Sequence, residues 1–306
     1  MDNDSLQTFF MRMSPVPRGV LRIGGSFLAV AGVIFVALRL RNYSVDLDVS
    51  GMTLLFFWWC MVLSLIYGAG NYFLAVSWWN FIKYFGGSIS ISEAVRVYGI
   101  SQLAKYVPGN IFHLAGRQVL GMASGLTSGI AAKSMVFEFG LLVLAGLQFS
   151  WLVLPLFIQS LLIPESIILF VISLLMTGFV LNLILGIHAS WAFFWQILFL
   201  LISSSVFAAL LVLSDSGGGL TPLVLLGCGG GFIIAWLVGL VTPGAPAGVG
   251  VRELVLLLLL GGLIDEGKLL TAILIGRIVT IVGDLAFFTA VHFIPSKFFQ
   301  TEKAHV

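Results

Sequence analysis

The stretch that decides the fold is TPGAPAGVGVRE, residues 242–253. It separates two strongly apolar runs, contains two prolines and three glycines, and ends in the charged pair Arg252 and Glu253. Backbone groups inside a lipid bilayer need hydrogen-bond partners from protein or from water. The stretch therefore predicts an interrupted helix that lines a polar cavity. The residues expected to break the helix are Pro243, Gly244, Pro246 and Gly248.

An earlier stretch, YVPGNIFHLAGR at residues 106–117, has the same organisation. The break at Pro108 and Gly109 precedes Arg117 by nine positions (117 − 108 = 9), and Pro243 precedes Arg252 by the same number (252 − 243 = 9). Paired Pro/Gly interruptions in the two halves of a membrane chain are typical of a transporter binding site. We therefore expect two re-entrant segments arranged as an inverted repeat.

The composition excludes an ordinary soluble domain. Of the 306 residues, 59% are hydrophobic and only 9% are charged, and the mean hydropathy is +1.11. Soluble domains carry about 25% charged residues. The fold class predicted is an all-α polytopic membrane protein, and the net charge of +2 is too small to indicate a nucleic-acid partner. Cys60 and Cys228 lie in apolar runs and are expected to be packing residues.

The apolar runs predict about eight crossings, if the second broken segment completes one. Basic residues near both ends favour termini in the cytoplasm. We expect a cytoplasmic arm at residues 1–20, a membrane domain at 21–295 and a cytoplasmic tail at 296–306. The uninterrupted spans are expected near residues 23–40, 52–76, 131–157, 166–187, 191–213, 221–241 and 269–293.

Tryptophans bracket the span expected at residues 52–76. The 19 positions from Trp59 to Trp78 correspond to roughly 28 Å at ~1.5 Å per residue, close to the ~30 Å hydrocarbon core. This spacing predicts that Trp58, Trp59, Trp78 and Trp79 form an aromatic belt at the two membrane surfaces. Stacking on a ligand is the alternative.

Charged residues within apolar segments are the main candidates for function, since each costs roughly 2.5–3.5 kcal/mol to insert. Guanidinium groups bind phosphate through two parallel hydrogen bonds, and half-helix N-termini add partial positive charge. The charged residues of the two motifs are therefore suited to binding a phosphate-bearing headgroup. The alternative is that the arginines extend to the membrane interface, or pair with Glu138, Glu253 and Asp284 to hold the bundle together. For Lys105 the alternative is an anchor at the interface. The expected substrate-binding residues are Tyr98, Gln102, Lys105, Asn110, Arg117, Glu138, Arg252, Glu253 and Arg277.

Spacing along the helices adds two expectations. Arg277 and Asp284 are seven residues apart and should share one helix face. Arg252 and Glu253 diverge by about 100° and should contact different partners. His113 is expected either to relay protons or to make a structural hydrogen bond. The histidines show no metal-ligand spacing and no nucleotide loop is present, so neither a metal site nor a cofactor is predicted.

The two motifs resemble the lysylphosphatidylglycerol synthase transmembrane region family. The resemblance rests on SQLAKYVPGN at residues 101–110 with Arg117, on Glu138, on Pro243 through Glu253, and on Arg277. It extends from about residue 20 to 295 and implies an integral membrane protein that handles lipids. In the fused members this region is assigned to moving the aminoacylated lipid between leaflets. Pro246 departs from the more glycine-rich stretch expected in the family.

The resulting prediction is a lipid translocase of the bacterial or archaeal cytoplasmic membrane. The soluble aminoacyl-transfer domain of the fused members is absent from this sequence, so aminoacylation is not expected. Standalone relatives are associated with glycolipid or polysaccharide assembly, so the lipid carries either an amino acid, a sugar or a plain phosphate headgroup. A lipid-modifying enzyme or glycosyltransferase partner and a homo-oligomer are compatible with this function. Two alternatives stay open: an enzyme acting on a lipid phosphate, and a non-transporting membrane partner of a glycosyltransferase.

Overall fold

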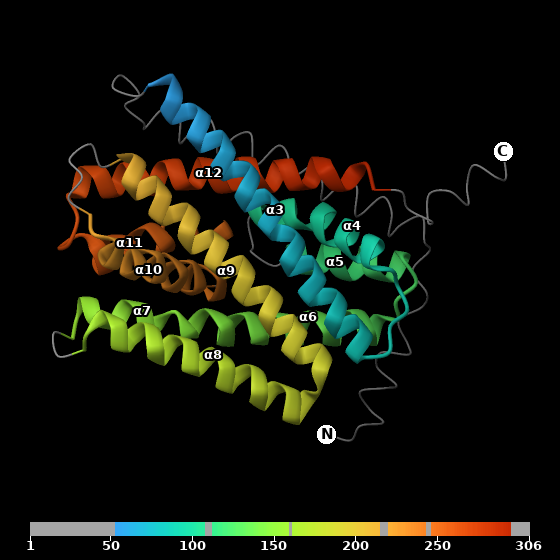
Figure 1. The fold of residues 1–306 in the computed structure, drawn as a ribbon. Coiled ribbons are helices and arrows are strands. Elements are labelled where there is room, and N and C mark those ends of the chain that lie inside the picture. The colour runs from blue at the N-terminus through green and yellow to red at the C-terminus, as the bar shows by residue number, and fades with distance from the viewer. Residues whose placement is uncertain (1–52, 108–111, 159–160, 215–219, 243–245, 295–306) are drawn as a thin grey trace.

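A computed structural model describes residues 53–107, 112–158, 161–214, 220–242 and 246–294 (Figure 1). All regular structure in these residues is helical, which confirms the all-α prediction. The α-helices are α3 (Leu54–Tyr84), α4 (Ile91–Gln102), α5 (Phe112–Ala123), α6 (Ser128–Gln148), α7 (Ser150–Val153), α8 (Ile163–Leu185), α9 (Ile187–Ser214), α10 (Pro222–Val241), α11 (Val251–Leu260) and α12 (Glu266–His292). Short 3₁₀ turns are η1 (Leu103–Tyr106), η2 (Leu154–Leu156) and η3 (Pro246–Gly248).

Within the described residues, six helical segments are long and apolar enough to cross a membrane. They are α3, α6 with its continuation to Leu156, α8, α9, α10 and α12. The chain is therefore a multi-pass membrane protein. The first expected span, at residues 23–40, and both tails lie outside the described residues. The count of about eight crossings and the orientation of the termini stay predictions.

Five of the ten described α-helices start at a residue whose side chain caps the first turn. A hydroxyl or carboxylate oxygen accepts a hydrogen bond from a backbone N–H of the first turn, which would otherwise lack a partner. At the other end of α8, Gly186 has φ of 79°, a conformation that glycine adopts without strain, and the chain turns directly into α9. The capping residues are Thr53, Ser90, Thr127, Thr221 and Asp265.

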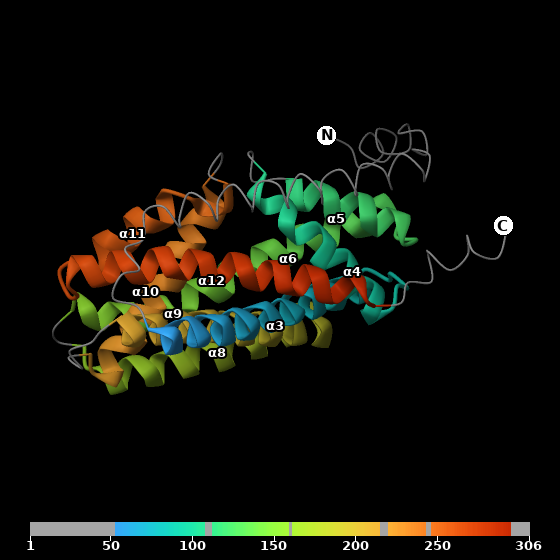
Figure 2. The same cartoon turned by 90° about the horizontal axis from the view of Figure 1, so that it is seen from above.

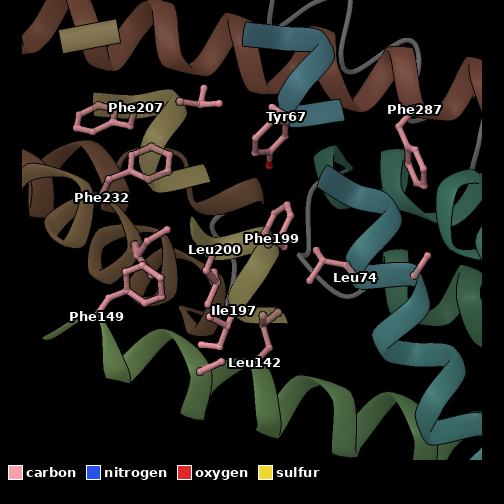
Figure 3. Close-up of a cluster of buried hydrophobic side chains, with 14 of the residues drawn as sticks. Tyr67, Leu74, Leu142, Phe149, Ile197, Phe199, Leu200, Phe207, Phe232 and Phe287 are labelled. Atoms are coloured by element: carbon pink, nitrogen blue, oxygen red, sulfur yellow. The ribbon is translucent and has the colours of Figure 1, made fainter. Parts of the chain in front are cut away.

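The core is built on close contacts of α3 with α9 and α12. A Cβ atom placed on Gly68 of α3 would lie 2.6 Å from the carbonyl oxygen of Gly283 on α12, so only glycine permits this crossing. Figure 3 shows side chains of α9, among them Phe199 and Leu200, in the middle of the buried cluster. Helix α10 also packs closely at its glycines, because a Cβ on Gly230 would lie 3.0 Å from Leu152 of α7.

Helix α3 corrects the predicted aromatic belt. The helix continues to Tyr84, beyond the predicted end at Val76, so Trp78 lies inside it. Trp78 is fully buried and its Nε1 donates to Ser134 Oγ at 3.0 Å, so its assignment to the membrane surface is wrong. The reason is periodicity: Tyr67, Leu74 and Trp78 share the face of α3 that meets the bundle. Trp79 is half-buried, and its Nε1 donates to the carbonyl oxygen of Ile89.

The opposite end of α3 agrees with the expectation of exposed tryptophans. Trp58 is 64% exposed and Trp59 is 46% exposed, in a helix whose first turns extend beyond the packed bundle. These two residues, unlike Trp78, are positioned to contact lipid or the membrane surface.

Both broken segments contain a short helix that folds back on its neighbour. Helix α5 has 12 residues and α11 has 10, hence lengths of about 18 and 15 Å, roughly half the hydrocarbon core. Helix α4 contacts α5, and α10 contacts α11. Figure 2 shows α5 and α11 on the same side of the molecule, opposite α3, α8 and α9. The lengths are those expected of half-helices, while re-entrance and the inverted repeat remain predictions.

Candidate functional site

A cavity between the two broken segments, called the central cavity below, has room of about 80 Å³. One water needs roughly 10–15 Å³ on this measure, so the central cavity holds several waters or a small polar group. Seven of the nine residues expected to bind substrate line it: Tyr98, Gln102, Lys105, Arg117, Glu138, Arg252 and Arg277. Glu253 is not among its lining residues. Asn110 lies outside the described residues, as do Pro108, Gly109, Pro243 and Gly244.

The described flanks of the two motifs meet in space. Turn η1, which precedes the first break, contacts η3, which follows the second. Ala247 of η3 packs against the cluster formed by Leu103, Tyr106 and Ile281. The matching Pro-to-Arg spacings in the sequence therefore correspond to segments that converge on one cavity.

Arg117 forms a buried ion pair at the wall of the central cavity. Its Nη1 donates to Glu138 Oε2 at 2.8 Å, and the two side chains are 2% and 4% exposed. The guanidinium carbon lies 3.8 Å from the centre of the Tyr98 ring and 5.5 Å from that of Trp78. Tyr98 also donates its hydroxyl to Glu138 Oε1 at 3.4 Å. The charge of Arg117 is therefore neutralised, as the alternative interpretation of this residue predicted.

Asp284 is the centre of a second cluster, which joins α3, α4, η1 and α12. Lys105 Nζ lies 2.7 Å from Asp284 Oδ2, and the Tyr106 hydroxyl donates to the same oxygen. Asn71 Nδ2 donates to Asp284 Oδ1 at 3.1 Å, and Gln102 Nε2 donates to Asn71 Oδ1 at 3.2 Å. Asp284 is 1% exposed, so these donors take the place of water around a buried carboxylate.

Arg277 fastens the second break to α12. Its Nε donates to Glu253 Oε1 at 2.5 Å, while Nη1 and Nη2 donate to the carbonyl oxygens of Ala247 and Gly248 at 3.0 and 3.1 Å. Glu253 Oε2 in turn accepts from the backbone N–H of Gly250 at 2.7 Å, which caps α11. Ala247, Gly248 and Gly250 all have positive φ, of 50°, 71° and 84°. The guanidinium of Arg277 is therefore engaged in stabilising an unusual backbone and is not a free positive charge.

Arg252 differs from the other three cations of the central cavity. It is 5% exposed, and its guanidinium carbon lies 4.0 Å from the centre of the Phe232 ring. In the part of the chain that the structure describes, no carboxylate forms an ion pair with it and no carbonyl accepts a hydrogen bond from it. Its neighbour Glu253 is directed to Arg277, as expected for adjacent residues on a helix.

The charges around the central cavity leave one positive charge over. Among the described residues, four cations line the cavity, namely Lys105, Arg117, Arg252 and Arg277. Three carboxylates pair with three of them, so the balance is 4 − 3 = 1. Electrostatic attraction is stronger in a buried site than in water, so this charge favours an anion in the cavity.

Several residues of the site escaped the sequence prediction. Tyr67 and Tyr106 line the central cavity, and Trp78 supports Arg117 from behind. Asn71 also escaped the prediction, although a polar side chain inside an apolar span was an available signal. Asp284 is expected as a partner of the arginines but is not among the residues expected to bind substrate. His113 lines the cavity as well, and its Nδ1 is buried without a hydrogen-bond partner among the described residues.

No protein-family model matches the chain, and no curated protein is significantly similar to it. The resemblance to the lysylphosphatidylglycerol synthase transmembrane region family therefore stays a prediction. Among the described residues, no group of three or more His, Cys, Asp or Glu side chains could hold a metal ion. The two cysteines are free thiols, Cys228 buried and Cys60 half-buried.

Proposed function

We propose that the protein moves a lipid with an anionic, phosphate-bearing headgroup between the leaflets of a membrane. The observation that carries this proposal is the buried guanidinium of Arg252, which lines the central cavity and has no carboxylate partner among the described residues. A buried charge is stable only when it is paired. A phosphate oxygen pair is the planar, bidentate partner that a guanidinium accepts best.

The other cations have supporting roles in this mechanism. Glu138 holds Arg117, and Arg277 holds the backbone of η3, so both keep the cavity open and polar. Arg252 lies in the first turn of α11, where the helix dipole adds partial positive charge. A headgroup in the central cavity would replace its hydration by these groups while its acyl or prenyl chains stay in the bilayer.

The resemblance of the two motifs narrows the substrates to be tried. It favours phosphatidylglycerol, an aminoacylated form of it, or a lipid-linked sugar, in a bacterial or archaeal cytoplasmic membrane. All of these carry a phosphate with at least one negative charge. A lipid-modifying enzyme or glycosyltransferase that supplies or uses the lipid is the partner that fits this function.

The test is leaflet exchange of headgroup-labelled lipid in proteoliposomes. Labelled phosphatidylglycerol, lysyl-phosphatidylglycerol and a polyprenyl-phosphate-linked sugar would be compared for wild type, Arg252→Gln and Lys133→Gln. Lys133 is an exposed cation on α6 that does not line the central cavity, so it controls for the loss of one charge. We expect Arg252→Gln to slow exchange by about tenfold or more, since hydrogen bonds to charged groups contribute ~1.5–3 kcal/mol.

Two results would contradict the proposal. Folded wild-type protein that moves none of these lipids would exclude translocation of them. Exchange by Arg252→Gln at the wild-type rate would show that the guanidinium does not take the headgroup. Either result would shift attention to an enzyme acting on a lipid phosphate, recognised by product formation, or to a membrane partner of a glycosyltransferase, recognised by co-purification with one.

A further inference from the structure

Lys105 is the most accessible and most adaptable cation of the central cavity. Its side chain is 17% exposed, compared with 2% for Arg117 and 6% for Arg277. Its ammonium group is compact and lies at the end of a flexible four-carbon stem, with three donors that rotate freely. It belongs to η1, a four-residue 3₁₀ turn that continues from the end of α4.

The carboxylate that holds Lys105 is less dependent on its cation than the other two. Asp284 also accepts hydrogen bonds from the Tyr106 hydroxyl and from Asn71 Nδ2, so two donors remain if the ammonium group leaves. Glu138, by contrast, would keep only the 3.4 Å hydrogen bond from Tyr98. Lys105 lines the cavity and Asp284 does not, so the lysine has ligand space on one side and its carboxylate on the other.

We propose that Lys105 is an exchangeable second ligand for the anion, paired with Asp284 while the central cavity is empty and with the phosphate when the headgroup enters. This inference rests on the proposed function and names the second cation of the same site. Arg252 would supply the permanent contact and Lys105 the conditional one. Asp284 then competes with the substrate for the ammonium group.

When Lys105 leaves Asp284 for the anion, the hydrogen-bonded cluster between the surrounding helices would change as well. Asn71 of α3, Gln102 of α4 and Asp284 of α12 belong to the hydrogen-bonded cluster that Lys105 completes. Withdrawing the ammonium group removes the only cation of that cluster. Cavity occupancy is thereby coupled to the contacts among three helices, two of which are membrane-spanning.

The sharpest prediction is that removing a buried carboxylate tightens anion binding. Asp284→Asn removes the competitor and leaves Lys105 free, so we expect short-chain phosphatidylglycerol to bind ~3–10-fold more tightly, a typical range for coupled neighbours. Lys105→Met should weaken binding several-fold, and the double variant should lose the gain of Asp284→Asn. A purely structural role of Asp284 predicts weaker binding in Asp284→Asn.

The measurement is calorimetric titration of dihexanoyl-phosphatidylglycerol into purified protein in detergent. Glu266→Gln is the matched control for the loss of one carboxylate, because Glu266 is exposed at the start of α12, does not line the central cavity and should leave binding unchanged. Asn71→Leu is the second variant. Asn71 does not line the central cavity, and its loss should bind Asp284 more firmly to Lys105 and weaken anion binding about two- to threefold.

The variant Arg252→Gln distinguishes two hypotheses. One is that the central cavity binds an anion, and the other is that Lys105 switches from Asp284 to that anion. If Arg252→Gln binds the lipid like wild type, the anion site itself is refuted. If Arg252→Gln binds weakly but Asp284→Asn binds no more tightly than wild type, the site stands and the exchange is overturned. If Asp284→Asn does not fold, unchanged or tighter binding by Asn71→Leu overturns the exchange.

Discussion

Arg117 and Arg252 hold equivalent positions in the two Pro-Gly motifs, yet their surroundings are opposite. Arg117 is enclosed by a carboxylate at 2.8 Å and by two aromatic rings. Arg252 has one ring, Phe232, and faces the central cavity without a carboxylate among the described residues. The first motif therefore contributes a neutralised arginine to the cavity wall. The second contributes an arginine whose charge no described carboxylate balances.

The difference arises from the helices that lie opposite each arginine. Helix α6 contacts α5 and brings Glu138 to Arg117. On the other side, the residue adjacent to Arg252 is Glu253, whose carboxylate caps α11 and is directed to Arg277. The two motifs thus share a sequence pattern without sharing charge partners, because charge pairing is decided by neighbours far away in sequence.

The largest effect expected from this comparison is on stability. Arg117→Gln leaves Glu138 buried without its cation, which should cost about 3–5 kcal/mol of unfolding free energy. Arg252→Gln removes a charge that no carboxylate balances, so its cost should be much smaller, or even a gain. Thermal unfolding of both variants in the same detergent measures the difference.

The double variant Arg117→Gln with Glu138→Gln is the control for this experiment. It removes both charges, so it should recover a large part of the stability lost in Arg117→Gln. If Arg252→Gln unfolds at a lower temperature than Arg117→Gln, it is wrong that Arg117 has the structural role and Arg252 the binding role.

The sequence was sufficient for the parts of this picture that depend on local patterns. A helix that crosses a bilayer needs a long apolar run, so apolar runs predict membrane helices. Six of the seven expected spans lie in the described residues, and they coincide with α3, α6, α8, α9, α10 and α12 to within several residues. Polar and charged residues in those runs and in the two broken segments predict the cavity, because each must find a partner or water. Seven of the nine expected residues indeed line it.

The pairing of those residues could not be read from the sequence. Arg277 and Asp284 share one face of α12 as expected, yet Arg277 contacts α11 and Asp284 contacts η1. Which partner each finds depends on how the helices cross, and contacts such as Gly68 with Gly283 set that crossing. The prediction that Trp78 lies at the membrane surface was wrong because it also depends on how the helices pack. The spacing from Trp59 fits the membrane thickness whether the Trp78 ring is buried in the bundle or exposed.

An intermediate effect is expected at the backbone of the second break. Gly248 has φ of 71°, and a Cβ placed on it would lie 2.9 Å from the Cα of Gly239 on α10. Gly248→Ala therefore combines the ~1–2 kcal/mol cost of a left-handed residue with displacement of a helix backbone. We expect a total loss of about 2–3 kcal/mol and a weaker anion site, because Arg277 binds the carbonyl oxygen of the same residue.

Gly250→Ala is the matched control for this substitution. Gly250 has φ of 84°, but a Cβ placed on it meets no atom within 4 Å. It should show the conformational cost alone, about 1–2 kcal/mol. Equal losses for the two variants would mean that the contact between η3 and α10 contributes nothing to the second motif.

The smallest effect concerns the aromatic support of Arg117. Trp78→Phe keeps a ring on the buried face of α3 but removes the hydrogen bond from Nε1 to Ser134. We expect the free energy of unfolding, measured by thermal unfolding, to fall by about 0.5–1.5 kcal/mol. Anion affinity should not change, because Trp78 supports Arg117 and not Arg252. Trp58→Phe, at a position 64% exposed, should leave stability unchanged. A larger loss of stability in Trp58→Phe than in Trp78→Phe would contradict the expectation that the buried end of α3, and not its exposed end, supports Arg117.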